Sequence, residues 1–139
     1  MNATRSALAA YGILKVLAVL IMLPGCQKED DDDPSNKVTM AFSTDSGYVY
    51  MNDTVATEDT LPVAVTITEG DDRLVTFKVL ASFDGAAEVT VDSLPISGET
   101  FTFEKRIITR AVPGTEQWTF WAQENDGDTY RRALTFLVE

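Results

Sequence analysis

The chain of 139 residues contains no histidine and a single cysteine, Cys26. One cysteine cannot form a disulfide within the chain. Without histidine, zinc sites of the Cys/His type and the Ser-His-Asp and Cys-His catalytic arrangements are excluded. We therefore expect a protein that is not an enzyme and needs no cofactor, with a core that depends on packing alone.

Basic residues are scarce. The chain has 11 Lys and Arg against 22 Asp and Glu, a formal net charge of -11. Binding to nucleic acid depends on cations that meet phosphates. Nucleic acid is therefore excluded as a partner, and so is direct adsorption to an anionic surface.

The N-terminal segment, residues 1–25, has a basic and then an apolar character. It contains Arg5 and Lys15, no acid, and a compact apolar block at residues 16–23. A basic stretch, a short apolar stretch and a small residue before the cut are typical of a secretory signal peptide. The alternative is a transmembrane anchor, but Lys15 limits the clean apolar block to far less than the roughly 20 residues that a spanning helix needs.

Cys26 directly follows the apolar block, in the sequence Leu23-Pro24-Gly25-Cys26. This quartet resembles the bacterial lipobox, although Pro24 departs from its commonest pattern. The resemblance implies that Cys26 becomes the first residue of the mature protein and carries diacylglycerol and an acyl chain such as palmitate. Each buried methylene adds about 0.8 kcal/mol of membrane affinity, so two or three chains would anchor the protein firmly.

A lysine and a run of acids follow the cysteine. Gln27, Lys28, Glu29, Asp30 and Asp31 resemble the export signal of Bacteroidota surface lipoproteins, which implies a lipid-anchored protein of the outer membrane that faces the cell exterior. The alternative is a solvated acidic tether, because a block of like charges repels itself and stays extended. Both interpretations apply together to residues 26–36.

From Lys37 to Glu139 the sequence has the texture of short strands. Apolar residues alternate with polar ones in successive runs that turn residues separate, and no stretch has a helical period. The alternating runs lie at residues 38–42, 61–67, 75–79, 88–91, 101–103, 118–120 and 134–138. We predict an all-β domain over residues 37–139, an antiparallel β-sandwich of about seven strands.

Two stretches add a resemblance to a family. LPVAVTITEGDDRLVTFKVLASFDG and TEQWTFWAQENDGDTYRRALTFLVE resemble the immunoglobulin-like domains of Bacteroidota surface lipoproteins, the second stretch being similar to the closing F–G hairpin. Such domains often accompany glycan-uptake or adhesion systems. The resemblance implies a non-catalytic binding or accessory module for glycans or envelope partners. The alternative is a structural spacer or adhesion component of an envelope assembly.

The two tryptophans lie three residues apart in one predicted strand. Side chains alternate between the faces of a strand. Trp118, in phase with Phe120, is therefore predicted to face the core, and Trp121 to face outward. An outward indole is a candidate contact for a sugar ring or a protein. The alternative is that Trp121 covers a neighbouring side chain.

Acids surround Gly127 in the last predicted turn. Oxygen ligands at Glu124, Asp126 and Asp128 could hold calcium weakly. The 12-residue EF-hand loop and its closing glutamate are absent, however, and a hairpin turn explains the same residues. We therefore predict no metal site.

Overall fold

The computed structural model describes residues 37–139. The predicted signal peptide (residues 1–25), the lipidation site Cys26, the export signal at residues 27–31 and the tether lie outside the described residues. In the part of the chain that the structure describes, no helix has the length and hydrophobicity needed to cross a membrane.

The described residues form strands without helices, so the predicted all-β fold class is confirmed. The structure has eight strands, one more than the alternating runs predicted. They are β1 (Thr39–Phe42), β2 (Asp53–Val55), β3 (Thr60–Thr68), β4 (Leu74–Phe83), β5 (Val89–Pro95), β6 (Thr100–Ile108), β7 (Gly114–Glu124) and β8 (Thr129–Val138).

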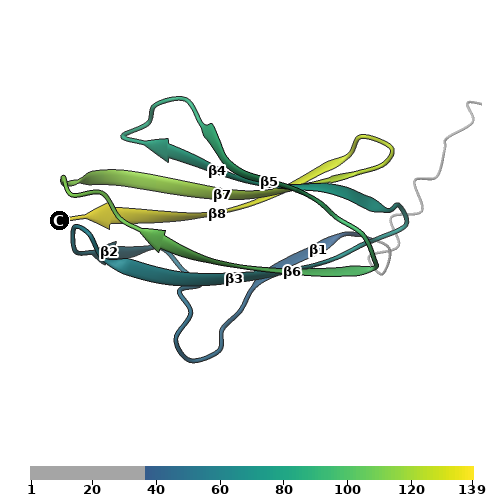
Figure 1. Ribbon diagram of the computed structural model, residues 1–139, viewed down its shortest axis with the longest axis horizontal. Helices are drawn as coiled ribbons and strands as arrows, with labels where there is room; N and C mark the ends of the chain where they lie inside the picture. Colours follow the sequence, from purple (N-terminus) through teal and green to yellow (C-terminus); the bar gives the residue numbers. More distant parts are fainter. Residues whose placement is uncertain (1–36) are drawn as a thin grey trace, which may run out of the picture. The chain divides into compact units, whose positions relative to one another are not determined.

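The strands form the two layers of a sandwich (Figure 1). One sheet has the order β1-β3-β6, and the other has the order β2-β8-β7-β4-β5. This is an immunoglobulin-like arrangement in which β7 and β8 take the places of strands F and G. All pairings are antiparallel except that of the three-residue β2 with β8, which is parallel.

The core lies between the inward faces of the two sheets and is apolar. From β3, Leu61, Val63, Val65 and Ile67 are buried. The ring of Phe77 on β4 packs against Phe103 of the opposite sheet, with 4.9 Å between the ring centroids. Burial of these side chains supplies the packing that replaces a disulfide, at roughly 1.5–3 kcal/mol for each large side chain.

The start of β4 departs from the predicted alternation. Val75 was expected to share the buried face of Phe77, but Leu74 is buried and Val75 is 39% exposed. The pairing of β4 with β7 shifts register between Leu74 and Thr76. An extra residue in a bulge reverses the phase of the side chains on one side of it, and this explains the exchange.

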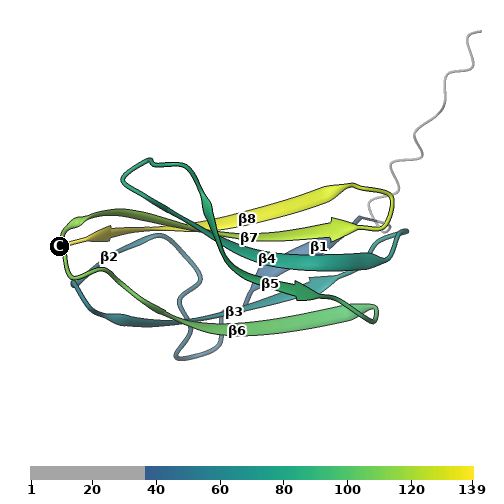
Figure 2. The ribbon, with the colours of Figure 1, turned by 45° about the horizontal axis from the view of Figure 1, so that its top comes forward.

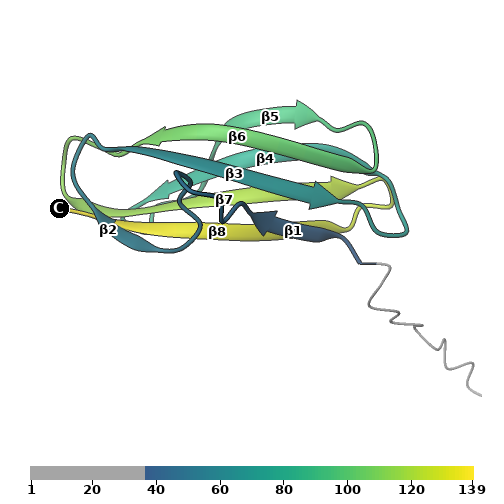
Figure 3. The same ribbon diagram turned by 90° about the horizontal axis from the view of Figure 1, so that it is seen from below.

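Two long connections lie against the outer faces of the sheets. Residues 84–88, between β4 and β5, arch over the five-stranded sheet (Figure 2). Residues 43–52, between β1 and β2, follow the edge of β3 (Figure 3) and project from the three-stranded sheet (Figure 1); Val49 N–H donates to the Pro62 carbonyl at 2.8 Å. Because of these connections each outer face has a hollow rather than a flat surface.

Candidate functional site

Trp121 lies on the outer face of the five-stranded sheet, between two cations. The register places Lys78 of β4 opposite Trp121 on one side and Arg131 of β8 opposite it on the other. The Lys78 ammonium lies 4.6 Å from the centroid of the indole, within the range of a cation–π interaction. We call Lys78, Trp121 and Arg131 the Trp121 row.

The predicted orientation of the two indoles is confirmed. Trp118 belongs to the core, is 7% exposed and donates from Nε1 to Glu116 Oε2 at 3.1 Å. Trp121 points to the opposite face and is half-buried. It is less open than a bare surface indole because the Lys78 side chain lies over it. A ligand contact at Trp121 stays a prediction.

A hollow of about 470 Å³ lies on the same outer face, under the 84–88 arch. Glu88, from the arch, accepts hydrogen bonds from Thr119 Oγ1 at 2.7 Å and from the Arg131 guanidinium. The bond from Thr119, followed by the bond and the charge of Arg131, holds the pKa of Glu88 below its usual value. The lining residues are Ser82, Gly85, Ala86, Glu88, Gln117, Thr119, Arg131, Arg132 and Ala133.

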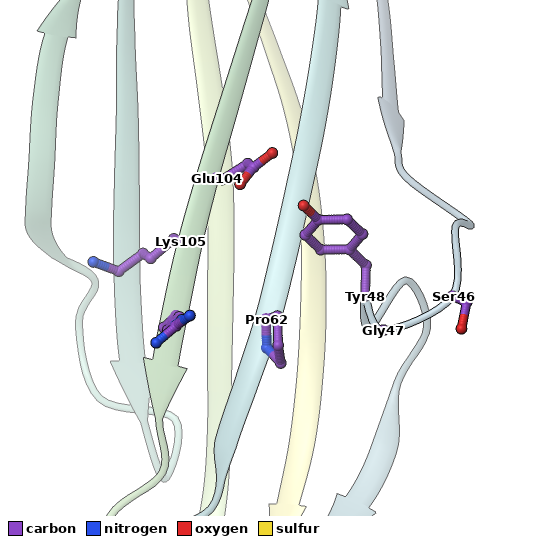
Figure 4. A pocket seen from close by; sticks show the side chains of 7 residues that line it. Ser46, Gly47, Tyr48, Pro62, Glu104 and Lys105 are labelled. Atoms are coloured by element: carbon purple, nitrogen blue, oxygen red, sulfur yellow. The ribbon is translucent and has the colours of Figure 1, made fainter.

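The three-stranded sheet has a hollow of about 440 Å³ on its outer face (Figure 4). The Tyr48 ring reaches in from the 43–52 connection, and its hydroxyl points toward Glu104 of β6. The hydrogen bond with Glu104, and then burial, raises the pKa of Tyr48. Sequence patterns could not predict this hollow, because its residues come from a loop and from the outward positions of two strands.

The three acids that were weighed as weak calcium ligands, and for which no metal site was predicted, meet at the β7–β8 turn. Carboxylate oxygens of Glu124, Asp126 and Asp128 lie within 4.8 Å of one another. Glu124 is 5% exposed, and burial, with the charges of neighbouring acids, raises the pKa of its carboxyl group. Calcium takes six to eight oxygen ligands, so three carboxylates make an incomplete set.

Tyr130 is the neutral partner of Glu124 at this end. Burial, and then its hydrogen bond with Glu124, raises the pKa of Tyr130 to about 12. The same hydrogen bond lowers the pKa of Glu124, but burial outweighs it. No cation balances Glu124 among the described ion pairs.

An ion-pair cluster that no sequence pattern had predicted lies at the other end of the sandwich. Glu116 is fully buried and accepts from Arg110 N–H at 2.7 Å and from Arg110 Nε at 3.3 Å. The same guanidinium forms two hydrogen bonds with Asp84, at 2.7 and 3.1 Å. The bond from Arg110, followed by that from Thr115 N–H, holds the pKa of Asp84 below its usual value.

Comparisons with known proteins give no family. No family model matches the chain, and no curated protein matches it. Solved structures with some likeness include the β-glucosidase of Listeria innocua in complex with gluconolactone (14% identity, TM-score 0.44) and with glucose (15% identity, TM-score 0.42). In both, the match covers 70% of this chain and 16% of the other. A likeness of this size carries no argument about function.

Proposed function

We propose that the chain is a surface-anchored lipoprotein whose β-sandwich is a non-catalytic binding module for a glycan or an envelope partner. The contact surface is the outer face of the five-stranded sheet. The observation that carries the proposal is the Trp121 row, in which a half-buried indole lies between Lys78 and Arg131. An aromatic ring beside hydrogen-bond donors is suited to a sugar ring or a protein surface.

The membrane part of the proposal is supported by the lipobox-like residues before Cys26. Cys26→Ala removes the thiol that would carry the lipid, so the variant should leave washed membranes and appear in the soluble fraction. The wild-type chain, fractionated in parallel, should pellet. A Cys26→Ala variant that pellets as the wild type does would contradict the lipid anchor.

Display at the cell surface is supported by the match at residues 27–31. Replacement of Lys28, Glu29 and Asp30 by Ala should protect the sandwich from protease added to whole cells while the chain still fractionates with membranes. The control replaces Asp32 and Asp33, which lie outside the proposed signal. Equal digestion of the triple variant and the wild type would argue against surface export.

The binding part of the proposal is tested on the full-length chain with an array of glycans and envelope extracts. Trp121→Ala should weaken the strongest wild-type signal by about ten-fold or more, as expected for an aromatic contact residue. Ile108→Ala removes an exposed apolar side chain of the other sheet and serves as the control. Binding that survives Trp121→Ala would contradict the proposed surface.

The stability of the same variants separates a contact residue from a core residue. Trp121→Ala should cost about 1–2 kcal/mol, whereas Trp118→Ala should cost about 3–5 kcal/mol because Trp118 is part of the core.

A wild-type chain that binds nothing on the array, yet remains in the envelope, would favour the alternative of a structural spacer or adhesion component.

A further inference from the structure

The hollow on the three-stranded sheet is a second candidate site, on the sheet opposite the Trp121 row. We call it the Tyr48 groove and define it by Ser46, Tyr48, Pro62, Glu104 and Arg106. None of these residues belongs to the five-stranded sheet. A ligand here would therefore be bound independently of Trp121.

The groove is formed by backbone contacts before any ligand arrives. The 43–52 connection is fixed to β3 at both ends, since Ser43 N–H donates to the Ala64 carbonyl at 2.9 Å and Val49 N–H donates to the Pro62 carbonyl at 2.8 Å. Ala64 faces outward but is 5% exposed. Tyr48 is thus held over the outer face of β3, and little conformational entropy remains to be lost on binding.

The floor and the polar wall come from paired strands. Arg106 lies opposite Pro62 and Glu104 lies opposite Ala64 in the β3–β6 register. Glu104 and Arg106 are two residues apart, so both side chains leave β6 on the outer face. Lys105, between them, points away from Tyr48 (Figure 4) and pairs with Asp92 at 2.7 Å.

Arg106 supplies the unused donors. Its exposed guanidinium has no hydrogen bond or ion pair among residues 37–139. Glu104 is close in sequence, but its carboxylate interacts with the Tyr48 hydroxyl. The groove therefore offers one free guanidinium fork, one carboxylate with spare acceptor positions, and the apolar surfaces of Tyr48 and Pro62.

We propose that the Tyr48 groove binds a uronic acid residue of an acidic polysaccharide. The sugar carboxylate accepts two parallel hydrogen bonds from Arg106, the geometry that guanidinium groups favour. Sugar hydroxyls donate to Glu104, and the C–H face of the ring packs on Tyr48 and Pro62. The volume of about 440 Å³ falls within the range of small-molecule sites.

The charge of the domain limits the alternatives. Residues 37–139 contain eight Lys and Arg against 17 Asp and Glu, so the field of the domain does not attract polyanions in general. Recognition then depends on the local fit of one carboxylate and its hydroxyl neighbours. A polyanion without the sugar ring, such as polyglutamate, should bind poorly.

The experiment is a calorimetric titration of the full-length chain with digalacturonate. The matched probe is methyl-esterified digalacturonate, which keeps the rings and masks the carboxylates. The affinity of the ester should be lower than that of the acid by about ten-fold or more, because the ester cannot form the two charge-assisted hydrogen bonds with Arg106. Ester binding as tight as that of the acid, or polyglutamate binding as tight as digalacturonate, would overturn the proposal.

Variants locate the site. Arg106→Gln should weaken digalacturonate binding about ten-fold or more. Arg73→Gln removes the same charge from an exposed arginine of the β3–β4 turn, outside the groove, and should change affinity by less than about two-fold. An equal loss of affinity in Arg106→Gln and Arg73→Gln would mean that only the net charge of the domain matters, and this would overturn the proposal.

Three variants keep this proposal separate from that for the Trp121 row. Trp121→Ala should leave digalacturonate binding unchanged, whereas Tyr48→Ala should weaken it about ten-fold. Tyr48→Phe, which keeps the ring, should retain most of the affinity. If Trp121→Ala alone abolishes digalacturonate binding, the Tyr48 groove is not the site. If Trp121→Ala does not change binding on the glycan array, whereas Arg106→Gln abolishes binding of digalacturonate, the Tyr48 groove is supported as a site and the proposed Trp121 surface is contradicted.

Discussion

The two ends of the sandwich treat a buried glutamate in opposite ways. Both glutamates belong to β7 and face inward, Glu116 near its start and Glu124 at its end. Glu116 is bonded to Arg110 and to the Trp118 indole. Glu124 has Tyr130 as its neutral partner and Asp126 and Asp128 as anionic neighbours.

The two ends are expected to differ in how much stability is lost when the buried glutamate is substituted. A buried carboxylate that accepts from a cation and several donors has its hydrogen bonds satisfied, and its removal leaves buried donors without an acceptor. A buried carboxylate among acids is destabilised as the anion and gains from a proton or from a neutral substitute. The Glu116 end should therefore be intolerant of change, whereas the Glu124 end should tolerate it.

The strongest test of this contrast is Glu116→Leu. The substitution leaves the Arg110 backbone N–H and the Trp118 Nε1–H without their acceptor, while the Arg110 guanidinium keeps Asp84. Each buried donor without a partner costs about 1–3 kcal/mol, so we expect a loss of about 3–5 kcal/mol. In thermal unfolding the midpoint should fall by more than about ten degrees for a domain of this size. Glu99→Leu, at an exposed position, is the control, and an equal fall in the two variants would remove the special role of Glu116.

A second test uses two glycines with positive φ. At Gly114 (φ 150°) an added Cβ would lie 2.3 Å from Asp84 Oδ1 and 2.4 Å from Arg110 Nη2. At Gly127 (φ 106°), in the turn of the acidic end, it would meet nothing within 4 Å. Gly127→Ala should cost about 1 kcal/mol through the backbone alone, and Gly114→Ala should cost about 1–2 kcal/mol more because the ion pair must move. Urea unfolding measures both, and a smaller loss at Gly114 would contradict the contrast.

The pH dependence of Glu124→Gln is the third test. Because the folded-state pKa of Glu124 is raised above its ordinary value of 4.5, the folded protein binds the proton more tightly than the unfolded chain. The contribution of Glu124 to the stability of the fold therefore falls as the pH rises from about 4.5 through the raised folded-state pKa. Glu124→Gln should be more stable than the wild type at pH 7, and this advantage should shrink as the pH falls toward about 4.

Asp84→Asn gives the opposite sign and serves as the counterpart. The pKa of Asp84 is lowered from its ordinary value of 3.8, so the stability that Asp84 contributes is present at neutral pH and lost as the pH falls through the lowered pKa. Asp84→Asn should be less stable than the wild type at pH 7, with a deficit that disappears in acid. Unfolding curves of Glu124→Gln and Asp84→Asn that shift in the same direction at pH 7 would contradict the comparison.

The smallest effect is expected from calcium. The set of three carboxylates is incomplete, and Tyr130 already bonds to Glu124, so millimolar calcium should move the melting temperature by less than about two degrees. A ligand at 100 times its dissociation constant would add about 2.7 kcal/mol and shift the midpoint by well over ten degrees. Magnesium is the control, and a large shift with calcium alone would establish a calcium site at the acidic end.

Most of the fold was predicted from the alternation of apolar and polar residues along the strands. In the run from Leu61 to Ile67 every second residue is a large aliphatic one, and the run is the interior of β3. The same rule placed Trp118 inside and Trp121 outside. It could not find β2, because three residues are too few for a period and their partner, β8, lies 83 residues along the chain at the pair Asp53 and Phe136. Nor could it anticipate the bulge at Val75, which depends on the neighbouring strand.

The candidate sites were predicted less well than the strands. Tyr48 lies in a connection whose polar residues indicated only a turn, and its partner Glu104 is 56 residues away, so the Tyr48 groove depends on tertiary structure. Glu116 did have a signal in the sequence, since it lies two residues before Trp118 and four before Phe120. A charged residue in phase with core aromatics is expected to be buried and to require a partner.

The position of β8 within its sheet determines when the domain can fold. Residues 129–138 are made after all the other strands, yet β8 lies inside the sheet, between β2 and β7. Until these residues leave the ribosome, β7 has an unpaired edge and β2 has no partner in its sheet. Pairs as distant as Asp53 and Phe136 also slow folding, because a long loop must close before the contact forms. The five-stranded sheet is thus expected to form only once residues 129–138 are available, whatever order the other strands fold in.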